Sequence, residues 1–514
     1  MAATNSTRAQ LPEGFAGQIE PLLPDDFEAF LASFDHPRSR GLRLNPAKTT
    51  WDELAPLLGF ERTPLAWCAD GSVVVDGVSL GRHPAHLAGL FYLQEPSSMA
   101  VAAALRPEPG WVVADLAAAP GGKTTHLASL VGPSGLVVAN EVVGSRLRPL
   151  HDNLDRWGAT NVVTTSLPVE SMVAPTGGFD GVVLDAPCTG EALFRRDPTA
   201  IRHWSPAAVE GAARRQAALL AQAARLVHPG GVLVYSTCSF NRAENEDRIA
   251  ELVTGSDQWE IEDCTWLGGS HGQSPSTSTG TGTTAAPATE RTARFWPHRG
   301  PGEGQFVARL RRLGAAPPGS HDLQWPSARH RRSVDRRPVG RSSGEPSSGE
   351  RSRRGSNVEA TRHRPLLDPT AAWHEFRVAF VPGFGGADTQ LEVRGDWIFA
   401  TPPTAAGLAW PELRRPGLPL GRIRPGRFEP HPALANTLDP NQVRSVVSWP
   451  GDHPDLSAYL RGETVSDPGP DGWVLICYHR WGLGWARRSR GILKNALPPH
   501  LRRQASGLAP RRQR

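Results

Sequence analysis

Between residues 111 and 237, apolar segments of strand length alternate with segments of helical periodicity. Strands are expected at Trp111–Asp115, Leu136–Asn140, Asn161–Thr165, Phe179–Leu184 and Val232–Tyr235. Helices are expected at Lys123–Val131, at Arg146–Trp157, and after a Ser205 cap followed by Pro206 and stopped at 228–231. Strands that alternate with helices form a parallel sheet covered on both faces. The pattern predicts a doubly wound α/β domain, which binds ligands beyond the carboxyl ends of its strands.

The chain of 514 residues exceeds one ordinary domain and suggests three or four folded units. Its net charge of +5 favours a polyanionic partner only weakly, and an arginine-rich bias without any partner stays open. Five cysteines without a close C-x-x-C pair favour a reduced intracellular protein with no metal. The polar start and the lack of a membrane-length apolar run predict a soluble, cytoplasmic chain without membrane contact.

Composition also predicts how the chain is divided. A small mixed α+β segment is expected at 1–90, with strands at Gly41–Asn45 and Val73–Val75, and the α/β domain at 91–313. A Ser/Thr/Gly-rich loop at 268–290 and an Arg/Ser/Pro/Gly-rich linker at 314–370 are expected to be disordered. A connecting segment at 371–415, a folded module at 416–505 and a basic tail at 506–514 follow, with strands expected at Phe376–Phe380 and Trp473–Tyr478.

The turn between the first strand and the first helix of the α/β domain has the composition of a nucleotide-binding loop. A phosphate-binding P-loop would need glycine at Ala117, and no G-x-G-x-x-G motif is present. An S-adenosylmethionine loop fits better, because Glu141 follows the next strand, where a ribose-binding acid is expected. A glycine-rich turn with a solvent-facing Glu141 is the alternative. The expected cofactor residues are Ala117, Ala118, Ala119, Pro120, Gly121, Gly122, Lys123 and Glu141.

Two cysteines follow two neighbouring strands. Cys188 comes after Asp185-Ala186-Pro187, and Cys238 comes after Ser236-Thr237. A lone buried cysteine is usually a small hydrophobic residue. Two cysteines at equivalent strand ends favour chemistry instead. A thiolate that adds to carbon 6 of a cytosine makes carbon 5 nucleophilic toward a methyl sulfonium, and a carboxyl group such as that of Asp185 can assist at N3. The target base must be flipped out of its stack.

These residues resemble the Nop/Sun family of RNA cytosine-carbon-5 methyltransferases, from about Phe91 to Arg309. The motifs that carry this resemblance are Phe91–Met99, Asp115–Thr125, Glu141, Phe179–Asp197, Tyr235–Glu246 and Gly302–Phe306. The resemblance implies a class I S-adenosylmethionine-dependent methyltransferase fold, with Cys238 as nucleophile and Cys188 assisting product release. Asp185 would face both the cofactor and the cytosine. Ala117 replaces the usual cysteine of the family, and Ser166 is the nearest equivalent of the acid that contacts the adenine.

The C-terminal motifs resemble the PUA-like RNA-binding domain of the RsmF-type branch of this family. They are Pro416–Ile423, Arg427–Pro430, Gly472–Cys477, Gly482–Trp485 and Gly491–Asn495. The resemblance implies a monomer whose partner is ribosomal RNA, specifically 16S, or the small ribosomal subunit. Two other functions stay open. A methyltransferase of proteins or small molecules would not need Cys238, and a non-catalytic ribosome-assembly factor would need neither thiol.

Overall fold

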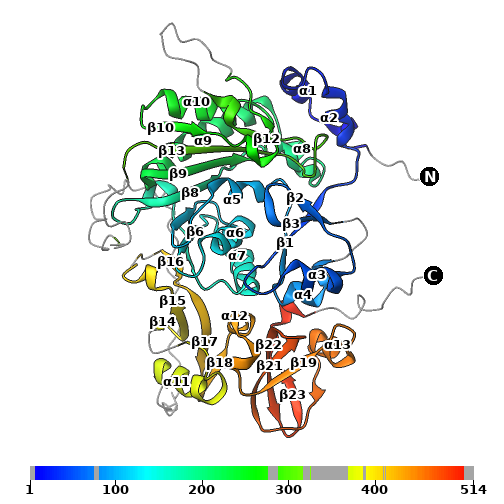
Figure 1. Cartoon of the computed structure of the whole chain (residues 1–514), viewed down its shortest axis with the longest axis vertical. Coiled ribbons are helices and arrows are strands. Elements are labelled where there is room, and N and C mark those ends of the chain that lie inside the picture. The colour runs from blue at the N-terminus through cyan, green and yellow to red at the C-terminus, as the bar shows by residue number, and fades with distance from the viewer. Residues whose placement is uncertain are drawn as a thin grey trace, which may run out of the picture.

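The computed structural model describes residues 6–74, 80–275, 288–315, 325, 368–385, 389–408, 410 and 412–502. Figure 1 shows the large α/β domain at the top, the N-terminal sheet beside it and the C-terminal sheets below. Among these residues, no helix combines the length and apolarity that a membrane crossing requires.

The central sheet confirms the predicted doubly wound α/β fold. Its strands run in the order β16-β7-β6-β5-β8-β9-β13-β12-β11, and β10 also pairs with β13. The five predicted strands are parallel: β5 (Val112–Asp115), β6 (Leu136–Asn140), β7 (Val162–Thr165), β8 (Phe179–Asp185) and β9 (Val227–Thr237). The remaining strands are antiparallel to their neighbours: β10 (Trp259–Glu262), β11 (Ser270–His271), β12 (Ala293–Phe295), β13 (Gln305–Arg312) and β16 (Leu413–Arg415).

The predicted helices are also present. They are α6 (Gly122–Val131), α7 (Gly144–Trp157) and α9 (Pro206–Leu226). Ser205 caps α9 by accepting a hydrogen bond from the backbone N–H of Ala208 at 3.1 Å. The expected stop at 228–231 is misplaced, because β9 begins at Val227 directly after the helix. Three further helices complete this domain: α5 (Met99–Leu105), α8 (Pro198–His203) and α10 (Glu246–Thr254).

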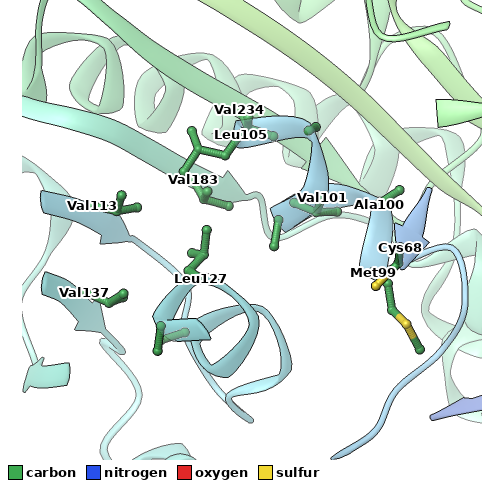
Figure 2. Packing of buried hydrophobic residues seen from close by; sticks show 14 of the residues in the cluster. Cys68, Met99, Ala100, Val101, Leu105, Val113, Leu127, Val137, Val183 and Val234 are labelled. Atoms are coloured by element: carbon green, nitrogen blue, oxygen red, sulfur yellow. The ribbon is translucent and has the colours of Figure 1, made fainter. Parts of the chain in front are cut away.

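The core beneath the site is aliphatic. Val113, Val183 and Val234 come from β5, β8 and β9, and they pack with α5 and with Leu127 of α6 (Figure 2). Each of these side chains has no exposed surface. Burial of one such side chain contributes about 1.5–3 kcal/mol. The carboxyl ends of the strands therefore project from a rigid base.

The N-terminal domain packs directly on the α/β domain. Its sheet has the order β2 (Thr63–Leu65), β3 (Cys68–Val74), β1 (Arg40–Leu44) and β4 (Phe91–Leu93). The strands predicted at 41–45 and 73–75 are confirmed, although Val75 lies outside the described residues. Helices α1 (Phe15–Ile19) and α2 (Phe27–Ser33) bury aromatic rings against the larger domain. The ring centroids of Phe30 and Phe240, for example, are 5.1 Å apart. Helices α3 (Trp51–Leu58) and α4 (Pro84–Leu87) complete this domain.

Two sheets form the C-terminal part. The first contains β14 (Gln390–Arg394), β15 (Trp397–Thr401), β17 (Leu418–Arg424) and β18 (Arg427–Pro430). The second contains β19 (Val446–Trp449), β21 (Gly472–Tyr478), β22 (Trp481–Ser489), β23 (Ile492–Asn495) and β20 (Val465–Ser466). Helices α12 (Pro432–Thr437) and α13 (Pro454–Arg461) pack on them. The strand predicted at 473–478 is confirmed.

The strand predicted at Phe376–Phe380 is wrong, because this segment ends helix α11 (Pro369–Phe380). The alternation of Phe376, Val378 and Phe380 imitates a strand, but Val378 is exposed while Trp373 and Phe376 are buried. The buried spacing is therefore that of a helix. Asp368 begins the helix by accepting a hydrogen bond from the backbone of Thr370 at 3.2 Å.

The predicted disordered segments lie mostly outside the described residues, which omit 276–287, 316–324 and 326–367. Their described parts are structured. Ser270–His271 form β11, although a loop is predicted there. Trp325, in the predicted linker, is buried, and its ring centroid lies 5.6 Å from that of Trp410. Its indole N–H donates a hydrogen bond to the carbonyl of Thr404 at 3.2 Å. The basic tail at 506–514 is also outside the described residues.

Candidate active site

The two predicted cysteines face each other at the carboxyl edge of the central sheet. β8 and β9 are parallel neighbours with Asp185 opposite Ser236, so the turns that follow them lie side by side. The sulfur atoms of Cys188 and Cys238 are 3.3 Å apart. Both residues are partly exposed, whereas the other three cysteines, Cys68, Cys264 and Cys477, are buried. Of the five cysteines, this pair alone has exposed surface at the carboxyl edge of the sheet, where ligands of such folds bind.

The surroundings of Cys238 favour its neutral thiol. The hydrogen bond with Cys188 raises the pKa of Cys238 well above its ordinary value, and burial and the charge of Asp185 add to this effect. The ammonium of Lys123 acts in the opposite direction. A change in its contact with Cys188 would remove the largest cause of this shift and favour ionisation of Cys238.

Asp185 and Lys123 form an ion pair between the cysteines and the loop after β5. Nζ of Lys123 is 2.7 Å from Oδ2 of Asp185. Burial disfavours the charged ammonium, but the charge and hydrogen bond of Asp185 outweigh it and raise the pKa of Lys123. Oδ1 of Asp185 accepts hydrogen bonds from Ser236 at 2.7 Å and Gln305 at 3.3 Å. The side chain of Lys123, an expected cofactor residue, thus binds Asp185 and acts electrostatically on Cys238.

A buried carboxylate, Glu244, fixes the turn that carries Cys188. It accepts hydrogen bonds from the backbone N–H of Thr189 at 3.0 Å, from Gln216 at 2.7 Å and from Asn241 at 2.8 Å. Gln216 also donates to the carbonyl of Pro187 at 3.1 Å. Glu244 and Gln216 have no exposed surface. The position of Cys188 is therefore set from both sides.

A second buried carboxylate, Glu191, fixes the turn that carries Cys238. It accepts hydrogen bonds from the backbone N–H of Phe240 at 2.5 Å and of Asn241 at 3.1 Å. Trp204 donates to it from α8's C-terminal end at 2.9 Å. Burial, followed by the nearby charge of Glu244, raises the pKa of Glu191. Asn241 donates to both carboxylates and so joins the two turns.

The predicted cofactor loop is held by hydrogen bonds to its carbonyl oxygens. Arg146 donates to the carbonyl of Ala119 at 2.7 Å, and Asn153 donates to that of Pro120 at 2.7 Å. The backbone N–H of Ala118 donates to the carbonyl of Asn140 at 2.9 Å. Gly121 precedes α6 with a φ of 110°, a conformation that favours glycine. The first-turn N–H groups of α6 remain available to a ligand.

Glu141 provides the test of whether a cofactor fits here. Its side chain is only 2% exposed, yet Oε2 accepts no hydrogen bond from the described residues. Oε1 accepts the backbone N–H of Val143 at 2.8 Å, and Arg146 lies 3.3 Å from Oε2 without the geometry of a hydrogen bond. A buried carboxylate oxygen without a donor fits the hydroxyl groups of a ribose. The site therefore suits S-adenosylmethionine.

Ser166 follows β7 beside the edge strand β16, and the preceding residue, Thr165, accepts a hydrogen bond from the backbone N–H of Glu141 at 3.1 Å. The backbone N–H of Ser166 donates to the carbonyl of Glu412 at 3.2 Å. The neighbouring Leu167 is held through its backbone by Asn140, whose side chain donates to its carbonyl and accepts from its N–H, both at 2.9 Å. Contact of Ser166 with an adenine stays a prediction.

Several polar residues of the site were not singled out from the sequence. Asp115 is buried at the end of β5, and burial raises its pKa to about 6. Gln216 is a buried amide on the apolar face of α9, and this break in the pattern was its only signal. Glu244 belongs to one of the family-like motifs, but nothing in its local sequence shows that it reaches the Cys188 turn.

Comparisons with known proteins agree with this geometry. The sequence matches the family described as 16S rRNA methyltransferase RsmB/F over residues 102–311. It also matches the N-terminal domain of 16S rRNA methyltransferase RsmF over 11–96 and the methyltransferase RsmF PUA domain over 449–503. The two resemblances stated from the sequence are thus confirmed.

Individual relatives support the same family over nearly the whole chain. It is 31% identical to ribosomal RNA small subunit methyltransferase F of Shewanella loihica, over 96% of this chain and 95% of that protein. The protein of the same name from Pectobacterium atrosepticum is also 31% identical, over 98% of both chains. A methyltransferase homolog from Pyrococcus horikoshii is similar in structure, with a TM-score of 0.50 and 31% identity over 58% of this chain and 94% of that one.

The geometry and the relatives that cover nearly the whole chain point to the same group of enzymes. Two facing thiols, a predicted cofactor loop with a buried acid nearby, and three matching domains occur together in one chain. The chain therefore belongs to the RsmF branch of the 16S rRNA methyltransferase RsmB/F family, whose members use S-adenosylmethionine.

Proposed function

We propose that this chain methylates carbon 5 of a cytosine in 16S ribosomal RNA through a covalent bond to Cys238. The 3.3 Å approach of the Cys188 and Cys238 sulfur atoms beside the Lys123–Asp185 ion pair carries this proposal. A methyltransferase that did not attack a ring carbon would need one general base rather than two facing thiols.

The reaction begins when the proton of Cys238 passes to the Asp185 carboxylate and the sulfur bonds to carbon 6 of the flipped cytosine. The Asp185 carboxyl group then donates that proton to N3, and the shift of electron density makes carbon 5 nucleophilic. S-adenosylmethionine, when bound, supplies the methyl group as a sulfonium. Carbon 5 gains that methyl group and then loses its proton to a base, and the carbon 6–sulfur bond breaks to release Cys238. Cys188 assists this last step from the facing turn.

Lys123 supports the nucleophile electrostatically. It acts to lower the pKa of Cys238, against the combined effects of Cys188, burial and Asp185. When the substrate base displaces Cys188 from its contact with Cys238, the largest cause of the raised pKa disappears. The ammonium then stabilises the thiolate while the base is in place.

The substrate assignment rests on the relatives and on domain composition. The relatives from Shewanella and Pectobacterium are named small subunit ribosomal RNA methyltransferases, and the C-terminal region matches the PUA domain of that family. We propose that the N-terminal domain (1–90) and the PUA-like domain (416–505) hold RNA around the catalytic domain (91–313).

Methyl transfer to 16S RNA, with each cysteine replaced in turn, tests the proposal. Cys238→Ala should abolish turnover while leaving binding of S-adenosylhomocysteine intact, because Cys238 is expected to touch the base rather than the cofactor. Turnover at the parent rate would contradict the covalent mechanism. The buried Cys264, changed to alanine, is the matched control for the loss of a thiol elsewhere in the same domain.

Cys188→Ala tests whether Cys188 assists the release of the methylated product. If it does, release is impaired in this variant, and the enzyme should accumulate as a covalent protein–RNA adduct that survives denaturing electrophoresis. The double variant Cys188→Ala/Cys238→Ala should form none. An adduct in the double variant would assign the covalent bond to another residue.

A further inference from the structure

Arg43 is a buried cation that forms no ion pair with the described carboxylates, although the charge of Asp70 acts on it from a longer distance. Arg43 lies in β1 of the N-terminal domain with no exposed surface. Burial lowers its pKa to about 10. An unpaired buried charge is costly unless other contacts compensate. The face of the Trp157 ring, 4.4 Å from the guanidinium carbon, provides one such contact.

The hydrogen bonds of Arg43 lead into the cofactor loop. Nη2 donates to the hydroxyl of Thr125 at 2.7 Å and to the carbonyl of Gly122 at 3.2 Å. The Thr125 hydroxyl in turn donates to the carbonyl of Gly121 at 2.8 Å. One guanidinium thus fixes the carbonyl groups of both glycines, directly or through one hydroxyl.

These contacts determine where the loop's donors point. In a planar trans peptide the C=O and N–H groups point in opposite directions. The carbonyls of Gly121 and Gly122 therefore fix the N–H groups of Gly122 and Lys123, which are first-turn donors of α6 without partners in the helix. Such donors hold polar or anionic ligand groups at helix N-termini.

The N-terminal domain also limits how far this turn can shift. Nε of Arg43 donates to Gln94 at 3.0 Å. A methyl group placed on Gly122 would lie 3.3 Å from the side chains of both Gln94 and Tyr92. The turn that begins α6 therefore packs closely against Tyr92 and Gln94, at and just after β4.

We propose that Arg43 is a positioning residue for cofactor binding, through which the N-terminal domain sets the affinity of the α6 turn for S-adenosylmethionine. It does not touch the cofactor itself. It acts through Thr125 and the carbonyls of Gly121 and Gly122. This role is independent of the covalent step at Cys238, because it concerns binding alone.

Calorimetric titration of the full chain with S-adenosylhomocysteine tests this role without any turnover. Arg43→Lys keeps the charge but loses the planar fork that reaches several acceptors at once. Thr125→Val removes only the relaying hydroxyl, with little change in shape. Each should raise the Kd about tenfold, the effect of one lost charge-assisted hydrogen bond. Thr125→Ser, which restores the hydroxyl, should return the Kd to near the parent value.

A matched control separates positioning from general destabilisation. Arg488 is a similarly buried arginine in β22, bonded to Asp467 and Ser445 far along the chain from the cofactor loop. Arg488→Lys should lower the Tm without changing the Kd. If Arg43→Lys does not fold, the Thr125→Val and Thr125→Ser pair decides alone. A parent-like Kd in folded Thr125→Val would overturn the proposal. So would an Arg488→Lys variant whose Kd for S-adenosylhomocysteine rises as much as that of Arg43→Lys.

Discussion

The cofactor loop and the two cysteine turns lie at the same edge of one sheet but are held by opposite chemistry. Donating side chains of Arg146, Asn153 and Arg43 bind carbonyl oxygens of the loop, and the N–H groups in the first turn of α6 have no partner within the helix. Buried carboxylates bind the N–H groups of the cysteine turns instead, Glu244 at Thr189 and Glu191 at Phe240.

This difference has an electrostatic consequence. The loop presents partial positive charge to a ligand, as a helix N-terminus does. At the cysteine turns the charge of Asp185 opposes a thiolate on Cys238, and the ammonium of Lys123 acts against this effect. One sheet edge thus offers donors to a polar ligand on one side and favours a neutral thiol on the other.

The largest effect is expected from Glu244→Gln on the cysteine side. The amide NH₂ would face donors from Thr189, Gln216 or Asn241, and an unsatisfied buried group costs about 1–3 kcal/mol. We expect kcat for RNA methylation to fall about thirtyfold, with an unchanged Kd for S-adenosylhomocysteine. The exposed Glu251→Gln is the control. A weaker cofactor Kd in Glu244→Gln would show that the two sides are not separable.

Glu141→Gln should give the opposite result. It weakens the acceptor that is free to bind a ribose, so the Kd for S-adenosylhomocysteine should rise about tenfold. Adduct formation by the Cys188→Ala protein at saturating cofactor should stay the same. Glu170→Gln, an exposed residue after β7, should change neither quantity. Loss of the adduct at saturating cofactor would argue that Glu141 also shapes the cysteine side.

The smallest effect concerns the pH dependence of Cys238. Because the pKa of Cys238 is raised, most of this residue is neutral thiol at neutral pH. Below that pKa, each increase of one pH unit should therefore make its alkylation by iodoacetamide about tenfold faster. Cys188→Ala removes the largest cause of the shift, so alkylation at pH 7.5 should become several times faster. Peptide mass spectrometry measures it, with buried Cys264 as the internal reference. A slower reaction would mean that Cys188 stabilises the thiolate.

The parallel strands, their order of appearance and the loop composition could be predicted because they depend on local pattern. The periodicity and length of the apolar segments distinguished strand β6 from helix α7. The sequence also predicts that the two strands followed by cysteines are neighbours, and β8 and β9 are. Phe376–Phe380 was misassigned because three alternating aromatic and aliphatic residues fit a strand as well as a helix. Only the burial of Trp373 and Phe376 together resolves this choice.

Long-range partners account for the remaining differences. Arg43 and Thr125 are 82 positions apart, and Glu244 reaches the N–H of a residue 55 positions earlier. The β16 strand joins the catalytic sheet beside β7 although it lies far beyond it in sequence. No local periodicity encodes such contacts, because each depends on how segments far apart in the sequence pack in the folded chain.

The sequence by itself determined which atoms are available for chemistry: two thiols, a carboxyl group, a lysine and a turn of small residues at strand ends. It could do so because strand ends and turns follow from local apolar pattern and glycine placement. Tertiary structure alone decided the direction in which the pKa of the Cys238 thiol shifts and the direction of the loop's N–H groups. Both depend on desolvation and on hydrogen bonds from residues far away in the sequence, and these exist only once the chain has folded.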